Sequence, residues 1–157
     1  MEFKQKEMII ASIRRVSLVI SILCLAVAFF NGIALWECIT GTIGFTSAQF
    51  PESEKLLLTV GYGFTVAIML LSAVLFFTMS RNGRPFTPKK IRLVLLIGVL
   101  LFIHSLVPTI IRFPLLGIRS VLTLVTSSSL LESLMFLLAA LIMYYASILQ
   151  RESDETL

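Results

Sequence analysis

Four long apolar stretches constrain the fold of this chain more than any other feature of its sequence. Each is close to the length of about 20 apolar residues that an α-helix needs to cross a hydrocarbon core of about 30 Å. They comprise residues 16–35, 57–79, 93–111 and 127–148. We therefore expect an all-α fold, an integral membrane four-helix bundle that forms a single domain from residue 1 to residue 157.

The composition excludes the usual classes of soluble protein. The chain is 57% hydrophobic and 14% charged, whereas about 25% of the residues of soluble domains are charged. The net charge of +4 lies beside the apolar stretches rather than on a separate basic face, so we expect no direct binding of nucleic acid. The first stretch is followed by Trp36 and Glu37 without a small-residue cleavage site, which favours a retained membrane anchor over a signal peptide.

The basic residues predict the orientation in the membrane. Short loops rich in Lys and Arg remain on the cytoplasmic side during insertion. Residues 1–15 contain four Lys or Arg, residues 80–92 contain five and the tail contains one, which gives ten on one side against three on the other. We therefore expect a multi-pass protein of the cell membrane with both termini, the basic loop 80–92 and the acidic tail 149–157 in the cytoplasm.

Five polar residues inside the apolar stretches share a similar expected depth. At a rise of about 1.5 Å per residue, they lie roughly 6–12 Å from the outer ends of their helices. We call them the outer polar layer, and they are Asn31, Tyr62, Thr65, His104 and Glu132. Polar groups in hydrocarbon are costly and must find partners, which makes this layer a candidate site.

Two interpretations of the outer polar layer remain open. In the first, His104 and Glu132 line an outward-opening polar cleft that binds a small ligand or changes protonation. In the second, Glu132 pairs with Arg112 or Arg119 or is protonated, and His104 forms an ordinary interhelical hydrogen bond. Pro108 follows His104 by four residues and is expected to kink or loosen the third helix under either interpretation.

The fourth stretch carries a stripe of mostly small residues on one helix face. Small residues allow helix backbones to approach each other closely in membranes, so another helix is expected to pack here. The stripe comprises Ser129, Ser133, Phe136, Ala140, Met143 and Ser147, with Glu132 on its shoulder.

The cytoplasmic side offers a second candidate surface. In the basic loop, Thr87 suits the cap of the third helix and Pro88 its first position. The ordinary role of such a loop is to set the topology and to lie near anionic lipid headgroups. Together with the acidic tail, it forms a candidate cytoplasmic docking surface. The candidate residues are Gly83, Arg84, Pro85, Phe86, Lys89, Lys90, Glu152 and Asp154.

Motifs for soluble chemistry are absent from the sequence. It contains one His, no Cys-x-x-Cys pair and no Gly-rich phosphate loop, and it shows no internal repeat and no heptad array. Cys24 and Cys38 are separated by about 20 Å along a helix, which is too far for a disulfide. We therefore expect no enzymatic activity, no catalytic residues, no metal and no cofactor.

Two segments of the chain resemble a known family. The segment NGRPFTPKKIRL and the closing ASILQRESDETL are similar to the small bacterial membrane proteins grouped as domain of unknown function 2975. In that family a Gly-x-Pro-Phe turn precedes a membrane helix, and a Leu-x-x-Glu-x-Asp segment ends the domain. The matching residues are Gly83, Pro85, Phe86, Leu149, Glu152 and Asp154. The resemblance implies a bacterial four-helix membrane protein without established catalytic residues, of a type often encoded beside a small helix-turn-helix regulator of the Cro/C1 type.

Two functional hypotheses follow. The first is a non-enzymatic sensor or regulatory partner of such a cytoplasmic regulator, with the outer polar layer as input and the cytoplasmic docking surface as output. The alternative is a small transport or efflux subunit in which Glu132 and His104 handle protons, and this role requires a homo-oligomer or an auxiliary partner. The lipid bilayer is the remaining expected partner.

Overall fold

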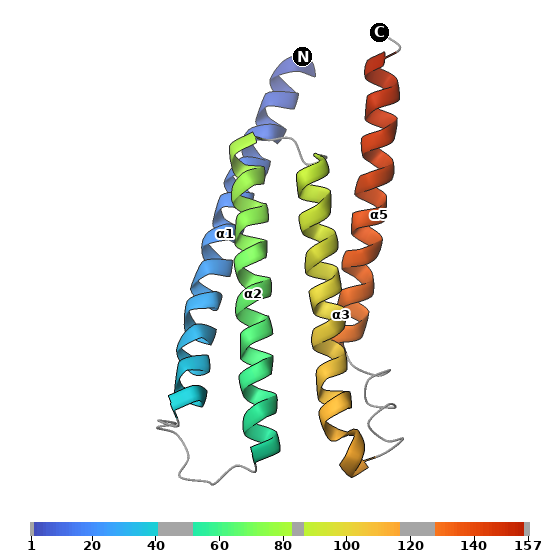
Figure 1. Cartoon of the computed structure of the whole chain (residues 1–157). Helices are drawn as coiled ribbons and strands as arrows, with labels where there is room; N and C mark the ends of the chain where they lie inside the picture. The colour runs from blue at the N-terminus through green and yellow to red at the C-terminus, as the bar shows by residue number, and fades with distance from the viewer. Residues whose placement is uncertain (1, 41–51, 83–86, 117–127, 156–157) are drawn as a thin grey trace.

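The described part of the chain consists of four α-helices (Figure 1). The computed structural model describes residues 2–40, 52–82, 87–116 and 128–155. The helices are α1 (Glu2–Thr40), α2 (Glu52–Asn82), α3 (Pro88–Leu116) and α5 (Ser128–Glu155). The prediction of an all-α fold with four helices is confirmed for these residues.

Each helix contains a segment that is long and apolar enough to cross a membrane. The candidate spans are Ala11–Thr40, Glu54–Arg81, Pro88–Arg112 and Leu130–Leu149. Large apolar side chains cover much of the outward surface, and water solvates such a continuous apolar surface poorly. Examples that are at least half exposed are Phe29, Phe30, Trp36, Leu131 and Leu141. These helices therefore fit a transmembrane protein.

The helices extend beyond the predicted apolar stretches. α1 begins at Glu2 and α5 ends at Glu155, while α2 and α3 shorten the predicted basic loop. The added segments are rich in Glu, Lys and Gln, which are good helix formers, so the helices continue past the apolar residues.

The first turn of α3 has the predicted cap. The carbonyl oxygen of Thr87 accepts hydrogen bonds from the backbone N–H groups of Lys90 and Ile91, at 2.9 and 3.0 Å. Pro88 occupies the first helical position, where a missing N–H removes no hydrogen bond from the helix. Thr87 and Pro88 therefore occupy the predicted positions before and at the start of the helix, and the bonds to Thr87 go to its backbone carbonyl.

The helices form an open row rather than a closed bundle. The pairs in extensive contact are consecutive: α1 with α2, α2 with α3, and α3 with α5. α1 and α5 therefore form the two edges of the row, as Figure 1 shows. The start of α1 and the end of α5 lie at the same end of the molecule, which is also where α2 ends and α3 begins (Figure 1).

A line of mostly small residues joins α1 to α2, and we call it the α1 seam. The hydroxyl of Ser21 donates a hydrogen bond to the carbonyl oxygen of Ala73 on α2, at 2.9 Å. The seam positions recur at alternating spacings of four and three residues, as in a coiled coil. They are Ser17, Ser21, Cys24, Ala28, Asn31, Leu35 and Cys38, all buried or half-buried. The sequence analysis missed this heptad spacing because small residues, and not large apolar ones, occupy it.

The other helices share a small apolar core. It consists of Ile68 and Leu75 from α2, Val94 and Ile97 from α3, and Ala140 from α5. Ile97 has no exposed surface. The core therefore connects α2 and α3, in the middle of the row, to α5 at one edge.

The predicted small-residue stripe of α5 faces α3. Ser133 is fully buried and Ala140 is 3% exposed. A Cβ atom added to Gly98 of α3 would lie 3.1 Å from the Cδ2 atom of Leu137. Phe136 is 37% exposed and lies at the margin of the stripe. The expected helix partner of the stripe is therefore α3.

Candidate functional site

Contacts between α1 and α2 bring three residues of the outer polar layer to one height. Ser21 contacts Ala73 across the antiparallel pair. Ten residues further along α1 lies Asn31, and ten residues back along α2 lies position 63, between Tyr62 and Thr65. Asn31, Tyr62 and Thr65 therefore lie at about the same level along the helix axes.

Contacts of α3 add the remaining two residues to this level. A Cβ atom added to Gly61 would lie 4.0 Å from Nε2 of His104, which places His104 beside the same part of α2. Gly98 meets Leu137 of α5, so Glu132 lies level with position 103 of the antiparallel α3. The five polar residues thus occupy one layer, as their expected depths indicated.

His104 is directed towards α2. Its ring lies against the ring of Phe64, with 5.9 Å between the centroids and an interplanar angle of 51°. A Cβ atom at Gly61 would be in ordinary van der Waals contact with Nε2, so the imidazole lies close to this turn of α2 without requiring a glycine there. α3 continues through Pro108 to Leu116, so the proline does not end the helix.

Two residues of the layer direct their polar groups to their own helices. The amide nitrogen of Asn31 donates to the carbonyl oxygen of Val27 at 2.8 Å. The hydroxyl of Thr65 donates to the carbonyl oxygen of Gly61 at 3.0 Å. Such bonds to the preceding turn pair a polar side chain inside hydrocarbon without another helix. Tyr62 is half-buried on the same stretch of α2.

Glu132 has different surroundings from His104. Its side chain is exposed on α5, whereas His104 is half-buried against α2. No hydrogen bond or ion pair joins Glu132 to His104 or to Arg112, which is also exposed. Arg119 lies outside the described residues. His104 and Glu132 therefore lie at the same height along the helix axes, but their side chains do not contact each other.

The described residues contain no group of three His, Cys, Asp or Glu side chains placed to hold a metal ion. Within the layer, Asn31, Thr65 and His104 each contact a different neighbour and share no hydrogen-bond partner. This arrangement supports helix packing at that level.

The structure describes part of the cytoplasmic docking surface. Lys89 is exposed, whereas Lys90 is 2% exposed and offers almost no surface. Glu152 and Asp154 lie in the last turns of α5, but their side chains are outside the described part. Residues 83–86, with Gly83, Arg84, Pro85 and Phe86, also lie outside it.

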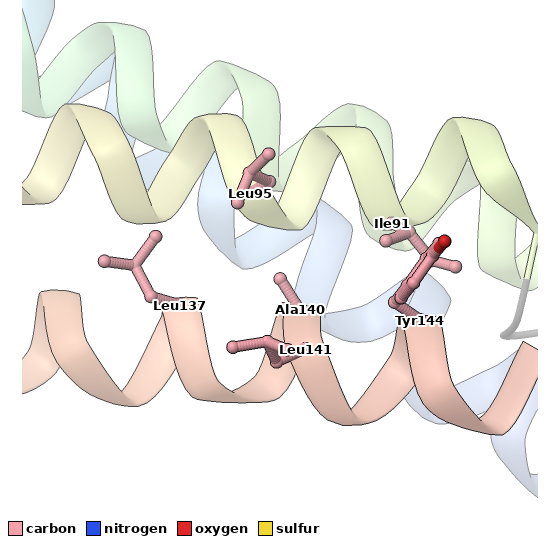
Figure 2. A pocket seen from close by; sticks show the side chains of 6 residues that line it. All are labelled: Ile91, Leu95, Leu137, Ala140, Leu141 and Tyr144. Atoms are coloured by element: carbon pink, nitrogen blue, oxygen red, sulfur yellow. The ribbon is translucent and has the colours of Figure 1, made fainter.

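An apolar groove lies between α3 and α5, and the sequence analysis did not anticipate it. It has a volume of about 270 Å³, and only apolar atoms line it. Figure 2 shows the lining side chains, which are Ile91 and Leu95 of α3 and Leu137, Ala140, Leu141 and Tyr144 of α5. We call it the α3–α5 groove.

The small side chain of Ala140 explains the groove. Ala140 is buried opposite Ile91 and Leu95, and its single methyl group leaves space that a larger residue would fill. The ring of Tyr144 lies beside Ile91 at one end of the groove (Figure 2). A small residue between larger ones on the α5 stripe was the available sequence signal, but it does not by itself distinguish a groove from close packing.

Comparison with protein-family models, with curated proteins and with solved structures finds no match for this chain. The resemblance to the domain of unknown function 2975 family stays a prediction based on its short motifs.

Proposed function

We propose that this chain is a non-enzymatic multi-pass protein of the cell membrane, with both termini in the cytoplasm, that acts as the regulatory partner of a small helix-turn-helix protein. The outer polar layer is the proposed sensing region. The surface formed by the basic loop and the end of α5 is the proposed output region.

One observation carries the proposal: two helices extend past their apolar spans at the same end of the molecule. α1 has nine residues before the span that begins at Ala11, and α5 has six residues after the span that ends at Leu149. At about 1.5 Å per residue these extensions measure about 13 and 9 Å. Both extensions lie at the end of the molecule where α2 ends and α3 begins (Figure 1).

The chemistry of these extensions suits a soluble partner. The α5 extension has the sequence QRESDE, which is polar throughout. Exposed basic residues at the same end are Arg14, Arg15, Arg81, Lys89 and Arg92. Cations at this level suit the lipid headgroups, whereas an acidic helix end beyond them is repelled by an anionic membrane and is left to face the cytoplasm. A basic surface on the regulator would complement this helix end.

The alternative of a transport subunit has less support. His104 contacts α2 and Glu132 is exposed on α5, so the described residues supply no shared path for a proton. We therefore propose the regulatory role alone.

Co-purification tests the regulatory role. The tagged full-length chain is co-expressed with each small helix-turn-helix protein that its gene neighbourhood encodes, extracted in mild detergent and captured. We expect the regulator to be retained, and we expect truncation after Gln150 or the double substitution Glu152→Gln and Asp154→Asn to weaken its retention.

Glu54→Gln is the matched control, because Glu54 is an exposed acid at the opposite end of the molecule. It should leave retention unchanged. Unchanged retention after truncation would remove α5 from the output region, and failure of the full-length chain to retain the regulator would overturn the proposed role.

Cysteine labelling tests the orientation separately. In a chain whose Cys24 and Cys38 are replaced by Ala, single cysteines are placed at positions 54 and 82. A membrane-impermeant maleimide added to intact cells should label position 54, and position 82 should react only after the membrane is opened. Labelling of position 82 from outside would reverse the proposed orientation.

A further inference from the structure

The α3–α5 groove is open on the apolar outer surface of the helix row, in the half of the molecule that carries the termini. Its walls include Leu95 and Leu141, which are 48% and 65% exposed, while Ala140 at its base is 3% exposed. Its volume of about 270 Å³ is roughly nine times the 30 Å³ that a water molecule occupies in the liquid. Its α5 wall runs over about two turns, from Leu137 to Tyr144, so this apolar space fits part of a hydrocarbon chain.

We propose that the α3–α5 groove holds one acyl chain of an anionic phospholipid, whose phosphate group is bound by Arg92. This proposal does not depend on the regulatory role, because it concerns only the contact between the helices and lipid. Its occupant is a lipid of the leaflet that faces the end of the molecule with the termini.

Arg92 stands close to the groove, where a phosphate group can reach it. It precedes Leu95 by three residues, so the two side chains lie on neighbouring positions of one helix face, and Arg92 is exposed. Lys89 is also exposed, but it lies on the side of α3 that faces away from Ile91 and Leu95. A lipid whose acyl chain follows Leu95 therefore has its headgroup about one turn closer to the start of α3, beside Arg92.

The first turn of α3 adds to the attraction. Thr87 caps this turn, and the N-terminal end of a helix carries a partial positive charge that favours anions. All the charged side chains described at this end are basic: Arg14, Arg15, Arg81, Lys89, Lys90 and Arg92. Glu152, the first acid of the α5 extension, follows Tyr144 by eight residues, about 12 Å along the axis.

Tyr144 suits the boundary between the acyl chain and the headgroup. Its ring lies across one end of the groove beside Ile91, and its hydroxyl group is at the far tip of the side chain (Figure 2). Tyrosine favours the membrane interface because its ring is apolar and its hydroxyl forms hydrogen bonds. The hydroxyl can donate to an ester or phosphate oxygen of the lipid.

Selectivity in this site must come from the headgroup. An acyl chain gains little by moving from the bilayer into an apolar groove, because lipid tails and apolar side chains are similar environments. A cation near the headgroup strengthens the binding of an anionic lipid about fivefold. With Arg92 beside the groove, we therefore expect phosphatidylglycerol to bind about fivefold more tightly than phosphatidylcholine.

Native mass spectrometry of the full-length chain tests this preference. Delipidated protein is titrated with phosphatidylglycerol or phosphatidylcholine, and the bound fractions are compared. Arg92→Gln should reduce the preference for phosphatidylglycerol about fivefold. Arg81→Gln is the matched control, because Arg81 is also exposed at this end but is on α2, away from the groove.

Equal losses for Arg92→Gln and Arg81→Gln would show a general attraction to the membrane surface and would overturn the proposal. Equal binding of the two lipids by the unmodified chain would also overturn it. Circular dichroism and gel filtration of each variant establish that the helices and the oligomeric state are unchanged.

A photoactivatable acyl chain locates the lipid. Phosphatidylglycerol carrying a diazirine in one tail should cross-link to the residues that line the groove, and Leu141→Trp should reduce this yield by filling the groove. Leu138→Trp is the matched control, because Leu138 is a similarly exposed residue of α5 that does not line the groove. Cross-links distributed around all the helices, or a second copy of the chain occupying the groove, would contradict the assignment.

Discussion

The two edges of the helix row are built in different ways. Between α1 and α2, the α1 seam places a small or half-buried residue at every contact from Ser17 to Cys38. Between α3 and α5, one close approach at Gly98 and Leu137 is followed by the groove above Ala140. The first pair is in extensive contact and is joined by the bond from Ser21 to Ala73, whereas the second approaches closely at one level and leaves a groove at another. A row of mostly small residues thus supports a helix contact, whereas one small residue facing larger ones leaves a groove.

The substitution Gly98→Leu should break the α3–α5 pair and produce the largest effect. A Cβ atom at this position would lie 3.2 Å from Cγ and 3.3 Å from the backbone nitrogen of Leu137. The backbone nitrogen cannot move without α5, so we expect a loss of about 3 kcal/mol in the free energy of unfolding. Reversible unfolding in mixed micelles measures this change.

Gly63→Leu is the control for that prediction. A Cβ atom at Gly63 would have no atom within 4 Å, so the same side chain should change the free energy of unfolding by less than about 0.5 kcal/mol. Similar losses for the two variants would show that the close approach at Gly98 does not hold α3 to α5.

The substitution Ala28→Leu should separate α1 from α2, with a somewhat smaller effect. Ala28 is 4% exposed in the centre of the α1 seam, and the larger side chain must push the helices apart or adopt a strained rotamer. We expect a loss of about 1–2 kcal/mol in the free energy of unfolding. Ala26→Leu places the same side chain on the exposed face of α1 and should have almost no effect. Equal destabilisation by Ala26→Leu would show that the α1 seam does not stabilise the contact between α1 and α2.

The substitution Ser21→Ala should have the smallest effect. It removes the hydrogen bond to the carbonyl oxygen of Ala73 but keeps the small size that the seam requires. Hydrogen bonds between helices in membranes contribute on average about 0.6 kcal/mol, and we expect a loss of that size. Ser12→Ala, an exposed position of the same helix, is the control. A loss larger than that of Ala28→Leu would mean that hydrogen bonding, rather than size, holds the seam.

Much of the fold could be predicted from the sequence, because the length of an apolar stretch alone predicts a spanning helix. The cap at Thr87 was also predictable, since a capping residue and a proline stand next to each other there. The packing between helices was harder to predict. In lipid, buried and outward residues have similar hydropathy, so the contact faces differ in size rather than in polarity. The stripe on α5 stood out through its serines, whereas the α1 seam mixes Ser, Cys, Ala and Leu and was missed.

The candidate site was predictable in depth but not in its surroundings. Counting residues from the helix ends placed His104 and Glu132 at one level, which the interhelical contacts support. Their directions depend on how each helix is rotated about its axis, and that rotation is set by contacts such as the one at Gly98. The groove depends on the same contacts, so neither its position nor its volume follows from a single helix.

The candidate spans shorten in order across the row. They contain 30 residues in α1, 28 in α2, 25 in α3 and 20 in α5, which corresponds to about 45 Å at one edge and about 30 Å at the other. The span of α1 is the longest because it includes charged residues at both ends, Arg14 and Arg15 at one and Glu37 at the other. Its uncharged run, residues 16–36, measures about 32 Å and matches a hydrocarbon core of about 30 Å. In a bilayer, a shift of α1 along the membrane normal would draw charged side chains into the hydrocarbon, so this edge of the row fixes the depth at which the molecule lies.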